Sequence, residues 1–271
     1  MTVGGNIINN LRYADDTVLL AETAKDLQNI VTIIKNESEE VGLKMNIKKT
    51  KSMVITKKSE VPKIDIRIDG KPIEQVSSFT YLGQLVTEDG RSEQEIRKRI
   101  GIAKSAFEKL SHIITNKKIQ TKTRIRLARC FVWPKLTYAC ETWTLSKSLA
   151  KKIDAFEMWT YRRIERISWK EKNPNKTILK DLGLQSLTLL RKIREQKVKY
   201  YGHTRRHDTL QRAILEGKIN GKRGKGRRRN SWTTNIAEIT GMKINQCSKV
   251  AMQRDEWRAM ASNLSNEKEP D

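Results

Sequence analysis

Residues 11–20 constrain this chain more than any other stretch, because they place two adjacent carboxylates between apolar runs. Ile7 and Ile8 precede the stretch, Val18-Leu19-Leu20 closes it, and Tyr13-Ala14-Asp15-Asp16 lies between them. Short β-rich runs on either side of a polar step predict a tight β-hairpin with both aspartates at its tip. Like charges this close disfavour ionisation of both carboxylates, whereas a hard cation such as Mg²⁺ beside them would favour it. The alternative is an ordinary solvent-exposed Asp-Asp turn.

The charge balance predicts a polyanionic partner. The 271 residues include 55 Lys and Arg against 31 Asp and Glu, which gives a net charge of +24 and a pI near 10. An electrostatic field of this sign favours nucleic acid or an acidic membrane surface. Hydrophobic residues make up 37% of the chain, and its length is sufficient for one or two folded domains.

Cysteine usage and the N-terminal residues predict the compartment. The three cysteines are far apart and include no Cys-x-x-Cys pair, which argues against a disulfide framework and indicates a reducing environment. Residues 1–6 lack the apolar run of a signal peptide, and no stretch is long and apolar enough to span a bilayer. We therefore expect an intracellular protein of the nucleus or cytoplasm, not secreted and without a membrane partner. The sequence leaves the oligomeric state open.

The pattern of apolar residues predicts an α+β arrangement before residue 91. Thr23 is a candidate N-cap for a helix with apolar residues at helical spacing, and Gly42 is a natural C-terminal stop. The elements expected after this helix are, in order, a strand over residues 43–48, a buried strand over 52–55, a hairpin turned at Asp69-Gly70, and a strand pair over 79–86 turned at Asp89-Gly90.

Helical spacing replaces this pattern from Ser92 onward. Five apolar residues fall on one face of the first helix, namely Ile96, Ile100, Ala103, Phe107 and Leu110. Further helices are predicted before Pro134 and over residues 149–167, 187–198, 232–242 and 250–264. The change of pattern predicts a domain boundary near residue 91 with a helical bundle after it.

Three motifs, in order, resemble those of a known family. Tyr13-Ala14-Asp15-Asp16 with its apolar flank resembles the catalytic palm hairpin of reverse transcriptases, above all those of non-long-terminal-repeat (LINE-type) retrotransposons. Gly42–Lys51 and Phe79–Gly83 resemble the next two blocks of that family. The resemblance implies the C-terminal portion of an endonuclease–reverse transcriptase polyprotein, truncated upstream of the Tyr-Ala-Asp-Asp block. It implies a partial palm over residues 1–91, a helical thumb over 92–145, and a basic helical region over 146–271.

The same resemblance implies an RNA-directed DNA polymerase that uses two Mg²⁺ ions for nucleotidyl transfer. Asp15 would be a metal ligand, and Asp16 would be the second, less direct catalytic aspartate. Lys49 matches the lysine proposed to protonate pyrophosphate, and a cation there would stabilise charge on the leaving group; without that role it is a solvated lysine. Tyr13 would lie near the primer terminus. Tyr81-Leu82-Gly83 matches the primer grip, where glycine lets the backbone approach nucleic acid closely.

Basic residues outside the palm are candidates to bind an RNA template and a DNA primer. Arg97 and Lys98 would contact the primer–template from the thumb. The run Lys218–Arg229 alternates glycines with basic residues and is expected to be a flexible phosphate-binding arm. Its alternatives are a solvated linker and a nuclear-import signal. The arm residues expected to bind nucleic acid are Lys222, Arg223, Lys225, Arg227, Arg228 and Arg229.

The sequence departs from the family in one respect. Residues 1–14 contain no Asp or Glu, so the upstream metal-binding aspartate of an active polymerase is missing, as are the fingers. Asp65 and Glu88 are the acidic residues that could lie near the hairpin. We therefore expect the chain to be inactive alone. Two rival hypotheses remain, a non-catalytic protein that binds RNA or RNA–DNA hybrid and a decayed reading frame without a selected function.

Overall fold

The computed structural model describes residues 2–3, 5–56, 60–216 and 231–264, and these divide into two compact units. We call Met1–Arg91 with Asp208–Gly226 the N-terminal unit, and Ser92–His207 with Arg227–Asp271 the helical unit. Strands and helices occur together in the first, whereas the described part of the second contains helices alone. The predicted α+β class is thereby confirmed. The identities of residues 1–91, 92–145 and 146–271 as palm, thumb and C-terminal region remain predictions.

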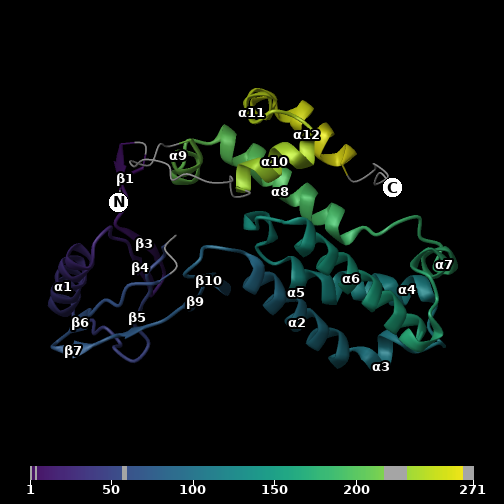
Figure 1. Ribbon diagram of the computed structural model, residues 1–271, viewed down its shortest axis with the longest axis horizontal. Coiled ribbons are helices and arrows are strands. Elements are labelled where there is room, and N and C mark those ends of the chain that lie inside the picture. Colours follow the sequence, from purple (N-terminus) through teal and green to yellow (C-terminus); the bar gives the residue numbers. More distant parts are fainter. Residues whose placement is uncertain (1, 4, 57–59, 217–230, 265–271) are drawn as a thin grey trace. The chain divides into compact units, whose positions relative to one another are not determined.

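Short two-stranded sheets form the strand part of the N-terminal unit (Figure 1). Four pairs are antiparallel: β1 (Thr2–Val3) with β2 (Asn6–Ile7), β3 (Asn10–Tyr13) with β4 (Asp16–Leu19), β6 (Arg67–Ile68) with β7 (Lys71–Pro72), and β9 (Ser78–Tyr81) with β10 (Gln84–Thr87). The parallel pair is β5 (Lys51–Ser52) with β8 (Glu74–Gln75). The helix α9 (Leu210–Glu216) also belongs to this unit.

The helix α1 (Ala24–Glu40) begins and ends where its sequence predicts. The Thr23 hydroxyl accepts a hydrogen bond from the amide of Asp26 at 3.1 Å, which satisfies one of the free donors of the first turn. At the other end Gly42 has φ +78°, its amide bonds the Glu39 carbonyl, and the Leu43 amide bonds the Ser38 carbonyl. This pair of bonds is a Schellman motif, which requires a left-handed residue at the position of Gly42.

The strand predicted over residues 43–48 is wrong. Residues 43–46 have no regular structure and 47–49 form a turn. The Asn46 carbonyl accepts from the amides of Lys49 and Thr50, and its side-chain oxygen accepts from Lys49 as well. Asparagine competes with regular structure in this way because its short side chain bonds nearby amides. The predicted strand over 52–55 is likewise reduced to β5.

The two later hairpins differ in how well the sequence predicts them. Asp69 and Gly70 have φ +51° and +72°, and they form the predicted turn between β6 and β7. The turn between β9 and β10 is Leu82-Gly83, with φ +48° and +78°, so the predicted turn at Asp89-Gly90 is wrong. Asp89 instead ends β10, because its carboxylate accepts from the Thr87 hydroxyl at 2.6 Å and from the Arg91 amide at 3.0 Å.

A small apolar core supports the N-terminal unit. Its buried members are Val31 on α1 and Ile66, Ile68 and Ile73 around β6 and β7. Packed against them are Leu19, Leu27, Met45, Ile47 and Ile64. Of the alternating apolar residues of 43–48, Met45 and Ile47 therefore face the core although the backbone there is not a strand, whereas Leu43 is 64% exposed. Leu19 joins the Asp-Asp hairpin to this core.

The helical unit contains most of the described helices. In chain order they are α2 (Glu93–Lys109), α3 (Ser111–Ile114), α4 (Thr121–Leu127), the π-helix η1 (Ala128–Val132), α5 (Trp133–Thr137), the 3₁₀ turn η2 (Cys140–Thr142), α6 (Lys147–Glu165), the 3₁₀ turn η3 (Trp169–Glu171), α7 (Asn175–Asp181), α8 (Leu189–Arg206), α10 (Trp232–Thr240), α11 (Ile244–Met252) and α12 (Arg254–Asn263). The single helix predicted over 250–264 is wrong, because Gln253 has an extended backbone, φ −88° and ψ 98°, and separates α11 from α12.

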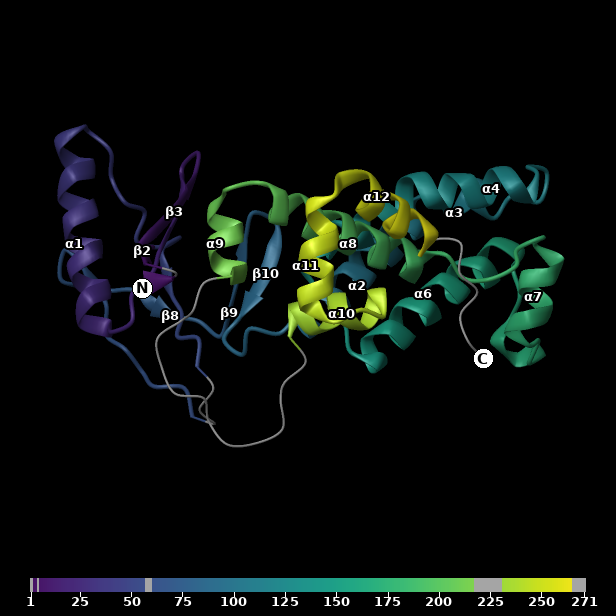
Figure 2. The ribbon, with the colours of Figure 1, turned by 90° about the horizontal axis from the view of Figure 1, so that it is seen from above.

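One hydrophobic core joins α2, α5, α6 and the start of α8. Ile96 and Phe107 on α2, Leu136 on α5, Ile153 on α6 and Ile193 on α8 are all fully buried in it. The core continues without a break past residue 145, so residues on both sides of that position pack together. Figure 2 shows α10, α11 and α12 beside α8. Among the described residues, no helix is both long and apolar enough to cross a membrane.

Pro134 lies inside a continuous helical stretch rather than after its end. The stretch runs from α4 through η1 to α5, with Pro134 at the second position of α5. A proline there donates no amide hydrogen, and its ring would clash with a carbonyl one turn earlier. The wider π-helical turn immediately before it accommodates the proline without breaking the helix.

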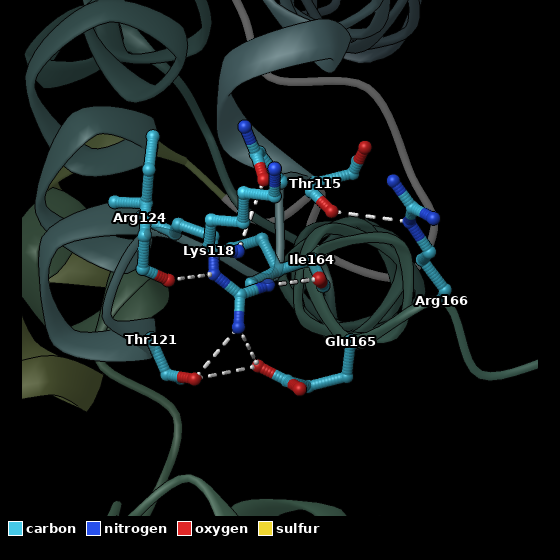
Figure 3. A network of polar contacts seen from close by, with 9 residues as sticks. Thr115, Lys118, Thr121, Arg124, Ile164, Glu165 and Arg166 are labelled. Atoms are coloured by element: carbon cyan, nitrogen blue, oxygen red, sulfur yellow. Dashed lines mark hydrogen bonds and ion pairs between the residues drawn. The ribbon is translucent and has the colours of Figure 1, made fainter.

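Arg124 fastens α4 to the end of α6 (Figure 3). Its side chain is 3% exposed and donates to the carbonyls of Ile119 and Ile164, while its remaining nitrogen contacts Thr121 at 2.7 Å and Glu165 at 3.1 Å. The last carbonyls of a helix have no partner within the helix. Arg124 supplies a charged donor to one of them.

Glu157 fastens α6 to the beginning of α8. Its carboxylate is fully buried and accepts from the amides of Thr188, at 3.0 Å, and Leu189, at 2.8 Å. It also accepts from the hydroxyls of Thr188 and of Tyr161, the latter at 2.7 Å. A carboxylate in this position satisfies the free amides of a helix N-terminus and is favoured by the helix dipole.

Close packing between α8 and α12 gives a stability prediction for Gly202→Ala. A Cβ at Gly202 would lie 2.2 Å from Cδ1 of Trp257, whose indole is held by a hydrogen bond to the Val198 carbonyl. We expect Gly202→Ala to lower the free energy of unfolding by about 1–3 kcal/mol through overpacking. The measurement is urea unfolding followed by tryptophan fluorescence, which reports the helical unit because all six tryptophans belong to it.

The matched control is Gly101→Ala on α2, where an added Cβ would meet no atom within 4 Å. It should leave stability unchanged or raise it by up to about 1 kcal/mol, since alanine favours a helix. Equal midpoints for Gly202→Ala and the unmodified chain would contradict the close packing of Gly202 on Trp257.

Candidate nucleic-acid interface

The Asp-Asp hairpin is present as predicted. β3 pairs with β4 in the register Tyr13 opposite Asp16, so Ala14 and Asp15 form the two-residue turn. All four residues are exposed, Tyr13 to 65%. Ala14 has φ +51°, a conformation that costs a residue other than glycine about 1–2 kcal/mol. The strained turn thus presents both carboxylates and the tyrosine ring at one exposed tip.

The described residues do not provide a complete two-metal site at this tip. No group of three or more His, Cys, Asp or Glu side chains suited to a metal ion occurs among them. Asp65 is engaged elsewhere, because its carboxylate binds the guanidinium of Arg67 at 2.8 Å. Two Mg²⁺ ions need many oxygen ligands in near-octahedral geometry, so Asp15 and Asp16 fit only part of such a site.

The other two motifs occupy turns of the N-terminal unit. Lys49 is exposed, and its amide donates to the carbonyl and the side-chain oxygen of Asn46, so the turn fixes the position of the lysine backbone. Leu82-Gly83 is the tip of the β9–β10 hairpin, with Tyr81 beside it and Leu82 39% exposed. The positive φ of Gly83 is explained by the turn itself. The roles of Lys49 as a catalytic residue and of Tyr81-Leu82-Gly83 as a primer grip remain predictions.

Arg97 and Lys98, the predicted thumb contacts, lie near the start of α2. Arg97 is exposed and paired with Glu93 at 2.6 Å, and Lys152 reaches the same carboxylate at 3.1 Å. These two cations lower the pKa of Glu93, Arg97 being the larger cause. Lys98 is half-buried. The pairing leaves Arg97 accessible to a phosphate only if Glu93 gives it up or shares it.

Arg99, one residue further on, faces the core. It is 8% exposed, its Nε donates to Glu95 at 2.6 Å, and its guanidinium lies 4.4 Å from the centre of the Tyr138 ring. The arm residues Lys222, Arg223, Lys225, Arg227, Arg228 and Arg229 lie outside the described residues.

The helical unit buries two titratable side chains, Cys140 and Lys197, whose burial the sequence analysis does not predict. Cys140 is fully buried, burial raises the pKa of its thiol to about 12, and its Sγ contacts the amide oxygen of Gln196. A thiol of that pKa is a poor nucleophile. Lys197 is fully buried as well, and its ammonium donates to the carbonyl of Trp143 and to Oδ1 of Asn235.

The sequence does contain a signal for Lys197. It follows Ile193 by four residues and precedes Tyr201 by four, so it occupies a position of the apolar face of α8. Burial lowers the pKa of the Lys197 ammonium to about 7, and the carboxylate of Glu238 opposes the shift.

Comparison with known proteins gives two matches, one to residues 6–86 and one to nearly the whole chain. Residues 6–86 match the family described as reverse transcriptase (RNA-dependent DNA polymerase). The chain is 29% identical over 279 aligned residues to a transposon-derived protein of Caenorhabditis elegans, and the alignment covers 96% of this chain and 97% of that protein. No solved structure matches this chain.

The resemblance to a retrotransposon reverse transcriptase, predicted from the three motifs, is confirmed. Residues 6–86, which contain the Asp-Asp hairpin, Lys49 and Tyr81-Leu82-Gly83, are a reverse-transcriptase-like segment. That family generally depends on divalent metal ions and binds nucleic-acid templates.

Lys197 gives a prediction for the pH dependence of stability. An unfolded lysine has a pKa of 10.5 and the folded one of about 7, so between these values only the unfolded chain holds the proton. The free energy of unfolding therefore rises with pH across this window. Relative to Lys197→Met, the unmodified chain should gain up to about 1 kcal/mol per pH unit between pH 7 and 10.

Urea unfolding at pH 7, 8.5 and 10 measures this difference. Lys151→Met, at an exposed position on α6, is the matched control and should show no such trend. A difference between Lys197→Met and the unmodified chain that stays constant over this range would contradict a neutral Lys197 at high pH.

Proposed function

We propose that this protein is a retrotransposon-derived, reverse-transcriptase-like protein that binds RNA–DNA hybrid but does not copy RNA by itself. The observation that supports the proposal most is the exposed tip of the β3–β4 hairpin, with Tyr13, Asp15 and Asp16 together. An exposed, strained hairpin tip with two carboxylates is a form suited to a primer terminus and a metal ion, and residues 6–86 match the corresponding family.

The same tip supports the absence of independent synthesis. In the family's two-metal mechanism, one ion activates the primer hydroxyl and the other stabilises the leaving pyrophosphate. The described residues offer two carboxylates there and no group of three. In this proposal Asp15 and Asp16 contribute part of the metal site, Lys49 lies toward the leaving group, and a further carboxylate must come from a partner or from an added palm segment.

Binding in this proposal depends on the basic residues. The net charge of +24 favours any polyanion. We expect Tyr81-Leu82-Gly83 in the N-terminal unit and Arg97 and Lys98 in the helical unit each to contact the hybrid. Cys130, Cys140 and Cys247 are free thiols, which supports a reducing, intracellular site of action.

Primer extension on poly(rA)/oligo(dT) with Mg²⁺ tests the proposal, with the unmodified chain and Asp15→Ala in parallel. We expect no extension by either protein, because the metal site is incomplete in both. Anisotropy of a labelled hybrid should show equal binding by the two, since Asp15 contributes no positive charge. The affinity should fall by about 3- to 4-fold, between 50 and 200 mM salt, for each phosphate contacted.

Extension by the unmodified chain that disappears in Asp15→Ala would contradict the inactivity and would require a third carboxylate from elsewhere. Hybrid binding that is undetectable at 50 mM salt would contradict the binding function itself.

A further inference from the structure

A pocket of about 380 Å³ lies in the helical unit, where η1 and α5 meet the first turns of α8. It is lined by Arg129, Trp133, Thr188, Arg191, Lys192 and Glu195. Its volume is in the range of small-ligand sites. None of these residues belongs to the reverse-transcriptase-like segment 6–86, so that resemblance does not explain the pocket.

The charge of the lining selects an anion. Arg129, Arg191 and Lys192 are cationic, and in the described part of the chain the Lys192 ammonium has no hydrogen-bond acceptor or ion-pair partner. The single carboxylate of the lining, Glu195, is paired with Lys199. Arg191 donates from Nε to the Leu187 carbonyl at 3.2 Å and has a further contact. Lys192 therefore gives the lining a positive charge that a ligand can neutralise.

Two buried donors of the lining lack an acceptor. The indole of Trp133 is 3% exposed and its Nε1 has no hydrogen-bond partner among the described residues, and the same holds for Nε of Arg129. A buried N–H without an acceptor is unfavourable, and an anion beside it would supply one. The Arg129 guanidinium is held in place, 5.2 Å from the centre of the Trp133 ring and 3.3 Å from the Tyr161 hydroxyl.

Two backbone amides at the start of α8 are already bound. Glu157 accepts from those of Thr188 and Leu189. An anion in the pocket would therefore be bound by side chains rather than by these two amides. A phosphate group fits such a lining, because it offers only acceptor oxygens, several at once, to guanidinium and ammonium donors.

We propose that this pocket binds a phosphate group through Arg129, Arg191, Lys192 and the indole N–H of Trp133. The phosphate belongs to a nucleic-acid strand or to a mononucleotide. The proposal of a phosphate ligand depends only on the lining of the pocket. A nucleic-acid source rests on the proposed function and adds a contact outside residues 6–86.

The first experiment observes the tryptophan indoles of the full chain by ¹⁵N NMR during titration with inorganic phosphate and, separately, with dTTP. The Trp133 signal is assigned as the one missing in Trp133→Phe. We expect this signal to shift and saturate with either probe, and Arg191→Gln/Lys192→Gln to weaken the affinity by about tenfold. No saturable shift at Trp133 with either probe, or the same titration curve in the double variant, overturns the pocket.

The second experiment identifies the source of the phosphate by hybrid binding. Arg191→Gln/Lys192→Gln is compared with Lys151→Gln/Lys180→Gln, which removes two exposed charges of the same unit away from the pocket. At 0.1 M salt we expect the pocket variant to lose about tenfold in affinity, with a salt slope smaller by about one, and the control to lose less. Lys192→Gln alone, the mildest change, should show part of the effect.

The outcomes separate the two proposals. Equal weakening by both double variants overturns the nucleic-acid source, and a dTTP-dependent shift at Trp133 then assigns the pocket to a mononucleotide. An unmodified chain that does not bind hybrid overturns the proposed function, while the phosphate titration still decides the pocket.

Discussion

The helical unit depends on the hydrogen bonds that one buried carboxylate, that of Glu157, accepts. It lies in the middle of α6, yet its partners are the first amides of α8 and the hydroxyl of Tyr161. Without Glu157, the amides of Thr188 and Leu189 would lose their acceptor. Without those amides, Glu157 would be a buried charge that lacks donors, which is also unfavourable. The same interaction fixes the position of Thr188, and through Tyr161 that of Arg129. The geometry of the phosphate pocket is therefore a consequence of how α6 holds α8.

The N-terminal unit is organised differently, because its apolar core is small and its sheets have two strands each. An isolated hairpin is marginal in water, so the Asp-Asp hairpin depends on Leu19 packing against the core around Val31. Its tip is free of such packing. This division between an anchored base and an exposed tip is what allows Ala14 to stay in a strained conformation beside the carboxylates.

Positive charge is used in two ways in this chain. Arg99, Arg124 and Lys197 are buried and bind carboxylates, carbonyls or aromatic rings, so they act as structural donors. Arg97 and Lys192 retain exposed or half-exposed positions. A net charge of +24 therefore overstates the charge available to nucleic acid. Long-range attraction depends on the total, whereas contact with individual phosphates depends on cations at exposed positions.

The sequence by itself determined the features that depend on neighbouring residues. Thr23 and Gly42 set the ends of α1, the two aspartates lie at the tip of the β3–β4 hairpin, and Asp69-Gly70 forms the turn between β6 and β7. These features follow from the sequence because capping and turn formation are local chemistry. Only the tertiary structure decided the rest. The pairing of Thr87 with Ser78 moved the hairpin turn to Leu82-Gly83. The turn at Asn46 is local chemistry as well, but the alternation of apolar residues predicted a strand in its place. Arg129 and Trp133 line one pocket with residues that follow 55 to 66 positions later in the chain, and their proximity depends on helix packing that no local pattern specifies.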